Sequence, residues 1–170
     1  NSCSPAFDDF LQLLGKRVRM AGWPKYAGGL DTTETSQLES VYTDWGGVEI
    51  MFHVGPLLPH IDVPDAQQTE KKRHIGNDIV VVIFMEGGFS DALDIDSFKS
   101  QFNTVFILVA PHRTAESVVI GYSMLVVMDG QVKPFGPQIP RRYIFDDLEY
   151  FRDFLLCKII QAELAALKTT

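Results

Sequence analysis

The stretch KKRHIGNDIVVVIF, residues 71–84, joins a basic run to a continuous apolar segment through a polar pair that begins with Asn77. A neutral carboxamide is no useful general base, but it can accept a hydrogen bond from water and donate one to an anion. Asn77 could therefore orient a water nucleophile, while the neighbouring cations dock an acidic partner in whose site the chemistry takes place. The basic residues of the run are Lys71, Lys72, Arg73 and His74.

The same residues also have a purely structural interpretation. Cations in the last turn of a helix interact favourably with the helix dipole, so a basic run is most often a solvated helix end. An asparagine that follows a glycine most often caps a helix C-terminus. From the residues alone, the capping role of Asn77 ranks above the water-positioning role.

A second group of side chains contains metal-ligating types, but at irregular spacing. We interpret this group as scattered surface polar residues and keep a metal-dependent hydrolase as a distant alternative. His53 ends an apolar run, which favours a half-buried, hydrogen-bonded imidazole over a metal ligand. The group comprises His53, His60, Asp62, Asp65 and His74.

Several classes of function are disfavoured by what the sequence lacks. It has neither a G-x-x-x-x-G-K-S/T nor a G-x-G-x-x-G pattern, so no phosphate-binding loop for a nucleotide is predicted. The H-E-x-x-H pattern of zinc proteases and the G-x-S-x-G pattern of serine hydrolases are also absent. With 22 acidic and 15 basic residues, the formal net charge is -7, and the surface as a whole should repel nucleic acid. No apolar run is long enough for membrane insertion. Cys3 and Cys157 favour reduced thiols in a cytoplasmic protein, although a disulfide stays an alternative.

The elements that must position these residues can be read from local signals. At 170 residues and 46% hydrophobic content, we expect a single domain over residues 1–170. Ser4, Pro5 and Gly15 bracket a first amphipathic helix, and an alternating segment follows it. Residues 39–54 read as a β-hairpin across the Gly46–Gly47 turn. Residues 63–76 read as a helix with a capping box at Asp65 and Gln68 that ends at Gly76.

The second half of the chain reads as strands followed by a long helix. Residues 79–84 and 104–110 have the continuous apolar character of strands buried on both faces, as do residues 117–128 less cleanly, and all three are expected to be central strands. Residues 132–140 form a proline-rich loop. The last helix should bury a stripe made of Leu148, Phe151, Leu155, Ile159 and Ala162. Helices that flank a central sheet indicate an α/β or α+β domain.

The run KRHIGNDIV resembles the signature of the Rap/Ran-GAP family, whose members are GTPase-activating domains for Rap-type small GTPases. Further stretches resemble the family in the same order along essentially the whole chain. The resemblance implies an α/β fold with a central mixed β-sheet flanked by helices, in a layout related to small GTPase G domains. VGPLLPH departs from the family's V-S-T-x-L-P-Y. The other matching stretches are SPAFDDFLQLLG, GGLD, ESVY, EIMFHV, DAQQ, PFGPQIP and FRDFLLCKIIQAE.

The resemblance also implies a role for each residue of the signature. It makes Asn77 the family's asparagine thumb, which supplies the water-positioning carboxamide that Rap-type GTPases lack. Arg73 and His74 are implied to support the thumb's helix and to contact the GTPase, and Lys71 and Lys72 to contribute electrostatic docking.

The implied partner is a GTP-bound Rap-type GTPase that carries both GTP and Mg²⁺, so no cofactor and no independent hydrolase activity are expected of this chain. A non-catalytic GTPase-binding or scaffold module with the same fold is the alternative. Because position 1 is not Met, we expect a fragment of a longer chain. The resemblance adds a homodimer through regions outside this chain as one possible arrangement.

Overall fold

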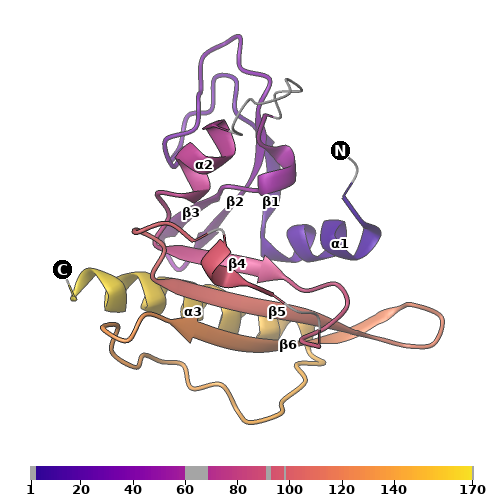
Figure 1. Cartoon of the computed structure of the whole chain (residues 1–170). Coiled ribbons are helices and arrows are strands. Elements are labelled where there is room, and N and C mark those ends of the chain that lie inside the picture. Colours follow the sequence, from indigo (N-terminus) through magenta and orange to yellow (C-terminus); the bar gives the residue numbers. More distant parts are fainter. Residues whose placement is uncertain (1–2, 60–68, 91–92, 98, 170) are drawn as a thin grey trace. The chain divides into compact units, whose positions relative to one another are not determined.

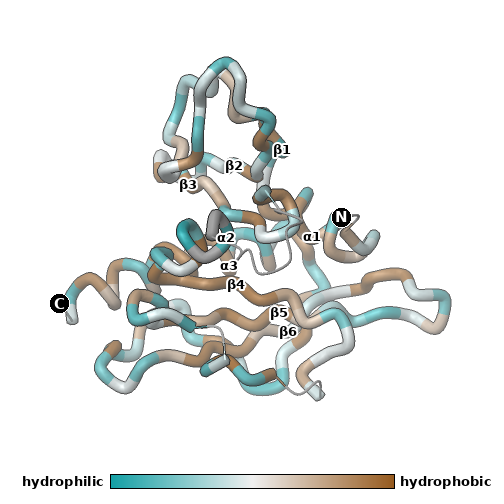
Figure 2. The backbone as a smooth tube through the Cα atoms, turned by 45° about the horizontal axis from the view of Figure 1, so that its top comes forward, coloured by the Kyte–Doolittle hydropathy of each residue, from teal (hydrophilic) through white to brown (hydrophobic). Residues whose placement is uncertain are grey.

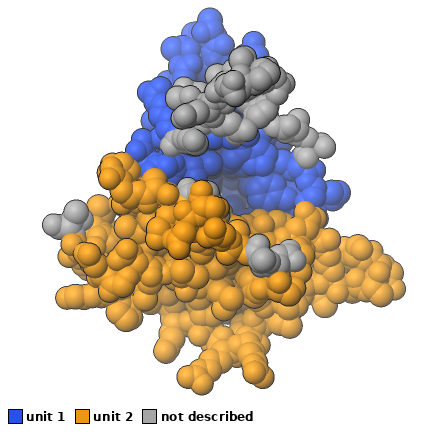
Figure 3. Space-filling view, in the orientation of Figure 1, with its two compact units in different colours: residues 1–77 blue, residues 78–170 orange. Residues whose placement is uncertain are grey.

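A computed structural model of the chain describes residues 3–59, 69–90, 93–97 and 99–169 (Figure 1). The chain divides into two compact units, residues 1–77 and residues 78–170 (Figure 3). The single-domain organisation stays a prediction. The elements in chain order are α1 (Pro5–Leu14), β1 (Lys16–Arg19), β2 (Glu39–Trp45), β3 (Val48–Phe52), the 3-10 turn η1 (Gly55–Leu57), α2 (Thr69–Ile75), β4 (Val80–Phe84), the 3-10 turn η2 (Ile95–Ser97), β5 (Val105–Arg113), β6 (Val119–Met128) and α3 (Leu148–Leu167).

Unit 1 begins with the helix that the sequence predicted. The Oγ of Ser4 accepts a hydrogen bond from the backbone N–H of Phe7 at 3.2 Å, and Pro5 occupies the first turn, where a missing N–H costs nothing. Gly15 ends the helix against β2. A Cβ at Gly15 would lie 2.4 Å from the carbonyl oxygen of Tyr42, so the close approach of helix end and strand requires glycine here.

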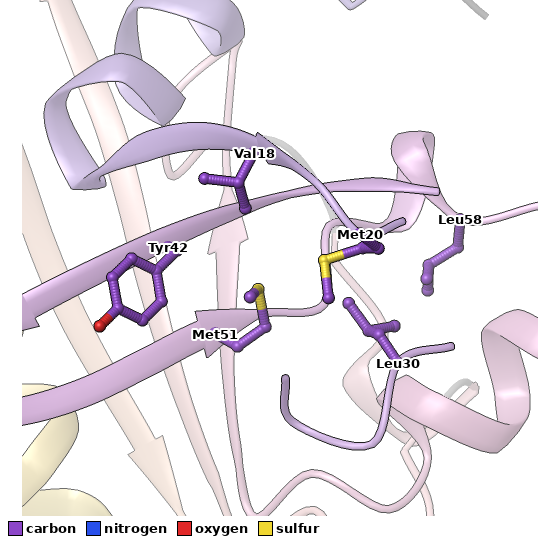
Figure 4. Close-up of a cluster of buried hydrophobic side chains, with 6 residues drawn as sticks. All are labelled: Val18, Met20, Leu30, Tyr42, Met51 and Leu58. Carbon is purple, nitrogen blue, oxygen red and sulfur yellow. The ribbon is translucent and has the colours of Figure 1, made fainter. Parts of the chain in front are cut away.

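The sheet of unit 1 has the antiparallel order β1-β2-β3, and its β2–β3 hairpin is the predicted one. Gly46 and Gly47 turn the chain with φ of 61° and 81°, and the Oδ1 of Asp44 accepts a hydrogen bond from Gly47 N–H at 3.1 Å. The core of the unit is a cluster of buried side chains from the strands and the loops beside them (Figure 4). Its members are Val18, Met20, Leu30, Tyr42, Met51 and Leu58.

Unit 2 contains a mixed sheet in the order β4-β5-β6, in which β4 and β5 run parallel and β5 and β6 antiparallel. Hydrophobic colour follows β4 and β5 over most of their length (Figure 2). The central strand β5 is buried from Val105 to Ala110, as predicted. β4 lies at the edge of the described sheet, with a paired strand on one side only, and its side chains are half-buried. The prediction that β4 and β6 are central strands buried on both faces was wrong, since β6 is the other edge strand of the described sheet and exposes Ile120, Leu125 and Val127.

Helix α3 packs against β4 and β5. The Oδ1 of Asp147 accepts a hydrogen bond from Tyr150 N–H at 3.0 Å and caps its first turn. Phe151, Leu155 and Ala162 are buried as predicted, but Leu148 is exposed and Ile159 half-buried. Leu148 is the first residue of the helix and precedes its first buried residue, Phe151. The remaining buried positions of the helix are Phe154, Leu156, Lys158 and Ala166.

The predicted fold class is confirmed in its coarser form, a mixture of helices with a mixed sheet. The described strands form two three-stranded sheets, where the sequence predicted one central sheet. The relation to the G-domain layout stays a prediction. Among the described helices, none combines the length and the apolar character that a membrane span requires.

Candidate functional site

Helix α2 carries the basic run to the end of unit 1. Its described part is seven residues long, which is too short for a stable helix without tertiary contacts. Ile75, the last helical residue, supplies such a contact by packing against the buried cluster of unit 1. In addition, a Cβ placed on Gly55 would lie 3.6 Å from the Cδ1 of Ile75, which is ordinary van der Waals distance. The end of the helix is therefore anchored to the hydrophobic core.

The basic side chains of α2 differ in exposure. Arg73 is exposed, whereas Lys71 and His74 are half-buried. Lys72 belongs to the same helix. The capping box predicted at Asp65 and Gln68 lies outside the described residues.

Helix α2 ends at Ile75, directly before Gly76, which was predicted to end it. Asn77, the next residue, caps the C-terminus of the helix. Its backbone N–H donates to the carbonyl oxygen of His74 at 3.1 Å, and its side-chain Nδ2 donates to the carbonyl oxygen of Arg73 at 2.6 Å. Because a carbonyl oxygen can only accept, this contact identifies which end of the amide is the nitrogen. The predicted capping role is confirmed, and the side chain of Asn77 is nevertheless exposed.

Asp78, the next residue, is anchored within unit 2. Its carbonyl oxygen accepts a hydrogen bond at 2.5 Å from the Nδ2 of Asn103, a buried side chain whose Oδ1 accepts from Ser100 N–H at 2.8 Å. Two backbone N–H groups, those of Thr104 and Val105, donate to the carbonyl oxygen of Ile79. Asn103 was missed from the sequence, because a lone asparagine before a strand carries no signal of which carbonyl it will meet.

Of the possible metal ligands, the structure brings two together. The imidazole rings of His53 and His74 have centroids 5.0 Å apart, and the Nε2 of His53 lies 2.8 Å from the carbonyl oxygen of Gly28. His53 is half-buried and hydrogen-bonded, as predicted. His60, Asp62 and Asp65 lie outside the described residues. Within the described ranges, no three His, Cys, Asp or Glu side chains are grouped as metal ligands would be.

The arrangement can present a carboxamide to a partner, with positive charge beside it. The donor end of Asn77 is held by its own helix, and the acceptor end belongs to an exposed side chain one residue beyond that helix. Arg73 adds an exposed cation in the preceding turn. These features suit the orientation of a bound molecule and the electrostatic docking of a partner.

Comparison with known proteins places this site in a family context. The chain matches the family model described as Rap/ran-GAP over residues 1–170. It is 44% identical over 169 residues to the mouse signal-induced proliferation-associated 1-like protein 1, covering 99% of this chain and 9% of that protein. It is 42% identical over 168 residues to the human GTPase-activating Rap/Ran-GAP domain-like protein 3, covering 98% of this chain and 16% of that protein.

The chain thus spans less than a fifth of the length of these curated relatives. Among solved structures it is similar to the "Structure of the TSC2 GAP domain", with a TM-score of 0.78 and 28% sequence identity. That match covers 98% of this chain and 85% of the other.

Proposed function

The chain belongs to the Rap/Ran-GAP family, and from this membership we propose that it is a GTPase-activating domain that stimulates GTP hydrolysis by a Rap-type small GTPase. GTPase activation is supported by the family match, by a relative named for that activity and by the GAP domain with which the fold agrees. The choice of a Rap-type, GTP-bound partner is the finer part of the proposal. It draws on the resemblance of the signature.

We propose that Asn77 is the asparagine thumb. The observation that carries this assignment is the division of its polar atoms: Nδ2 donates to the carbonyl oxygen of Arg73, and the side chain remains exposed. Within the described part of the chain, no protein donor engages its Oδ1. A fixed donor leaves an oriented acceptor, and an oriented acceptor is what the positioning of a water molecule requires.

This mechanism differs from that of an arginine finger, which neutralises charge on the transferred phosphoryl group. An asparagine brings no charge, so its contribution is orientation: it holds the water in line with the γ-phosphate and prepays part of the entropic cost of reaction. We assign GTP and Mg²⁺ to the partner, since the sequence offers no phosphate loop.

The basic side chains of α2 have docking roles in the proposal. Arg73 and His74 support the helix and contact the GTPase, and Lys71 and Lys72 contribute to electrostatic attraction. The parallel pair β4–β5, with α3 packed against it, is the part of the fold that supports a layout related to G domains. A cytoplasmic location fits the free thiols of Cys3 and Cys157, because thiols stay reduced there.

The test is GTP hydrolysis by a purified Rap-type GTPase with saturating amounts of parent or Asn77→Ala chain. Removing one group that positions the transition state typically costs about 10²–10³ in rate. We expect a loss of this size in kcat, with binding to the GTP-loaded partner largely retained. A variant that binds and melts like the parent and also accelerates hydrolysis like it would reduce Asn77 to a helix cap. If the parent itself binds without accelerating hydrolysis, the chain is a binding module.

A further inference from the structure

His53 connects the sheet of unit 1 to the helix that ends at Asn77. It directly follows β3, and its half-buried Nε2 lies 2.8 Å from the carbonyl oxygen of Gly28. The carbonyl can only accept, so Nε2 carries a proton and donates it. This directed hydrogen bond fixes the orientation of the imidazole ring.

The approach of His53 to the loop requires glycine at position 28. Gly28 has a φ of +59°, and a Cβ on it would lie 3.2 Å from the Nε2 of His53 and 3.3 Å from the Cβ of Met51. A larger residue would therefore be strained in its backbone and would press on the imidazole. The geometry on this side of His53 is closely defined.

The ring of His53 also contacts α2. Its centroid lies 5.0 Å from that of His74, at an interplanar angle of 54°. The carbonyl oxygen of His74 accepts the backbone N–H of Asn77 at 3.1 Å. His74 thus contacts the ring of His53 with its side chain and the backbone of Asn77, the proposed thumb, with its carbonyl oxygen.

Two contacts are needed to orient a short helix. The packing of Ile75 on the buried cluster fixes where the end of α2 lies, but an apolar contact is non-directional and permits rotation about the helix axis. The contact between His74 and His53 supplies the second point, and the hydrogen bond to Gly28 fixes His53 in turn. Rotation of the helix about its axis would change the direction in which the carboxamide of Asn77 points.

We propose that His53 is a positioning residue for Asn77, acting through His74. This inference rests on the proposed function, and it extends the machinery from the signature to the end of β3 and the glycine of the preceding loop.

The first test compares steady-state kinetics of stimulated GTP hydrolysis by the parent, His53→Ala and His53→Phe. Displacement of a positioning group by about 1 Å can cost up to 10²-fold in rate. We expect kcat to fall about 10- to 100-fold in His53→Ala with KM unchanged. His53→Phe keeps a ring against His74 but cannot donate to Gly28, so its loss should be smaller. The control is His112→Ala, which removes a half-buried imidazole 2.7 Å from the Oγ of Ser123 in unit 2 and should leave kcat unchanged.

The second test is a double-mutant cycle. If His53 acts through Asn77, His53→Ala should cause no further loss of kcat in an Asn77→Ala background. Equal losses in both backgrounds would overturn the proposal, as would parental kcat in His53→Ala. Parental kcat in Asn77→Ala would instead refute the thumb and leave the structural coupling to be judged separately.

The structural coupling between His53 and Asn77 can be tested by amide hydrogen exchange, which needs no GTPase. The Asn77 N–H is bonded to the carbonyl oxygen of His74, so it should exchange faster when the ring packed against His74 is removed or is no longer fixed by the hydrogen bond to Gly28. We expect faster exchange at Asn77 in His53→Phe, which should fold even where His53→Ala fails, and parental exchange in His112→Ala. An Asn77 amide that exchanges at the parental rate in His53→Phe would overturn the positioning role.

Discussion

At the scale of single residues, the capping and water-positioning roles of Asn77 prove compatible. The sequence set them as alternatives, because glycine followed by asparagine is a common helix end. In the structure, capping uses the Nδ2 atom alone, through its 2.6 Å contact with the carbonyl oxygen of Arg73. Water positioning would use the other polar atom, Oδ1. The hydrogen bond that caps the helix therefore also restricts the direction in which Oδ1 points.

The substitution Asn77→Asp separates the two atoms. A carboxylate has no hydrogen to donate, so it would oppose the carbonyl oxygen of Arg73 with a second acceptor. We expect a loss of about 1 kcal/mol in the free energy of unfolding and a loss of at least about 10²-fold in kcat. Thermal melting and stimulated hydrolysis measure the two effects.

Asn77→Gln is the matched control for this substitution, because it keeps the carboxamide on a longer stem. It should retain more activity than Asn77→Asp. If the Asp variant melts at a lower temperature but hydrolyses GTP at the parental rate, only the cap matters.

At the scale of elements, predictions succeeded where the signal is local. Ser4 and Pro5 start α1 and Gly46–Gly47 turn the hairpin because their own backbone and side-chain chemistry suffices. Burial was harder to predict, since it depends on neighbours distant in sequence. β4 has the composition of a central strand but lies at the edge of the described sheet, and Leu148 continues an apolar period beyond the packed part of α3.

In the candidate site, too, the local features could be predicted from the sequence and the tertiary contacts could not. The end of α2 and the cap at Asn77 follow from Gly76 and its neighbours, so the sequence predicted them. The contact between His53 and His74 depends on how β3 and α2 meet, and Asn103 depends on which carbonyl faces it. No local pattern encodes either contact, and both appeared only with the tertiary structure.

Lys158, a buried charged residue of α3, holds the proline-rich loop against this helix. It is buried on α3, and its Nζ donates to the carbonyl oxygens of Phe135 at 2.8 Å and Pro137 at 3.0 Å while lying 4.1 Å from the centroid of the Phe135 ring. The proline-rich loop is thereby tied to the helix. Burial lowers the pKa of Lys158 below its usual value of 10.5, because it disfavours the charged form.

Replacing Lys158 with Met should destabilise unit 2. The apolar stem is kept, but two carbonyl oxygens lose their donor, which should lower the free energy of unfolding by about 1–3 kcal/mol. The unfolded parent binds this proton more tightly than the folded parent, so the parent's stability should rise as the pH approaches 10.5, and the variant should lack this component. Urea denaturation at several pH values measures both effects. Lys168→Met, at the exposed end of α3, should change stability by less than about 0.5 kcal/mol.

At the scale of the whole molecule, the basic run of α2 stands against an acidic background. The formal net charge is -7, so the chain as a whole repels an acidic partner, and any attraction must come from a local patch. Exposed Arg73 is the described residue best placed to supply it. Because interactions between exposed charges are screened by salt, attraction by such a patch should give a salt-dependent rate of association.

Reversing that charge tests whether the patch docks the GTPase. In Arg73→Glu, kcat/KM at low salt should fall and its decline with added KCl should become shallower, since less attraction remains to be screened. The kcat at saturation should be retained in large part, because Asn77 is capped by the backbone carbonyl of Arg73, which the substitution leaves in place. Arg141→Glu makes the same change in net charge at an exposed position of unit 2 and should leave the salt dependence as in the parent. If both variants match the parent at low salt, the run is a solvated helix end. If both lower kcat/KM equally, net charge rather than α2 controls association.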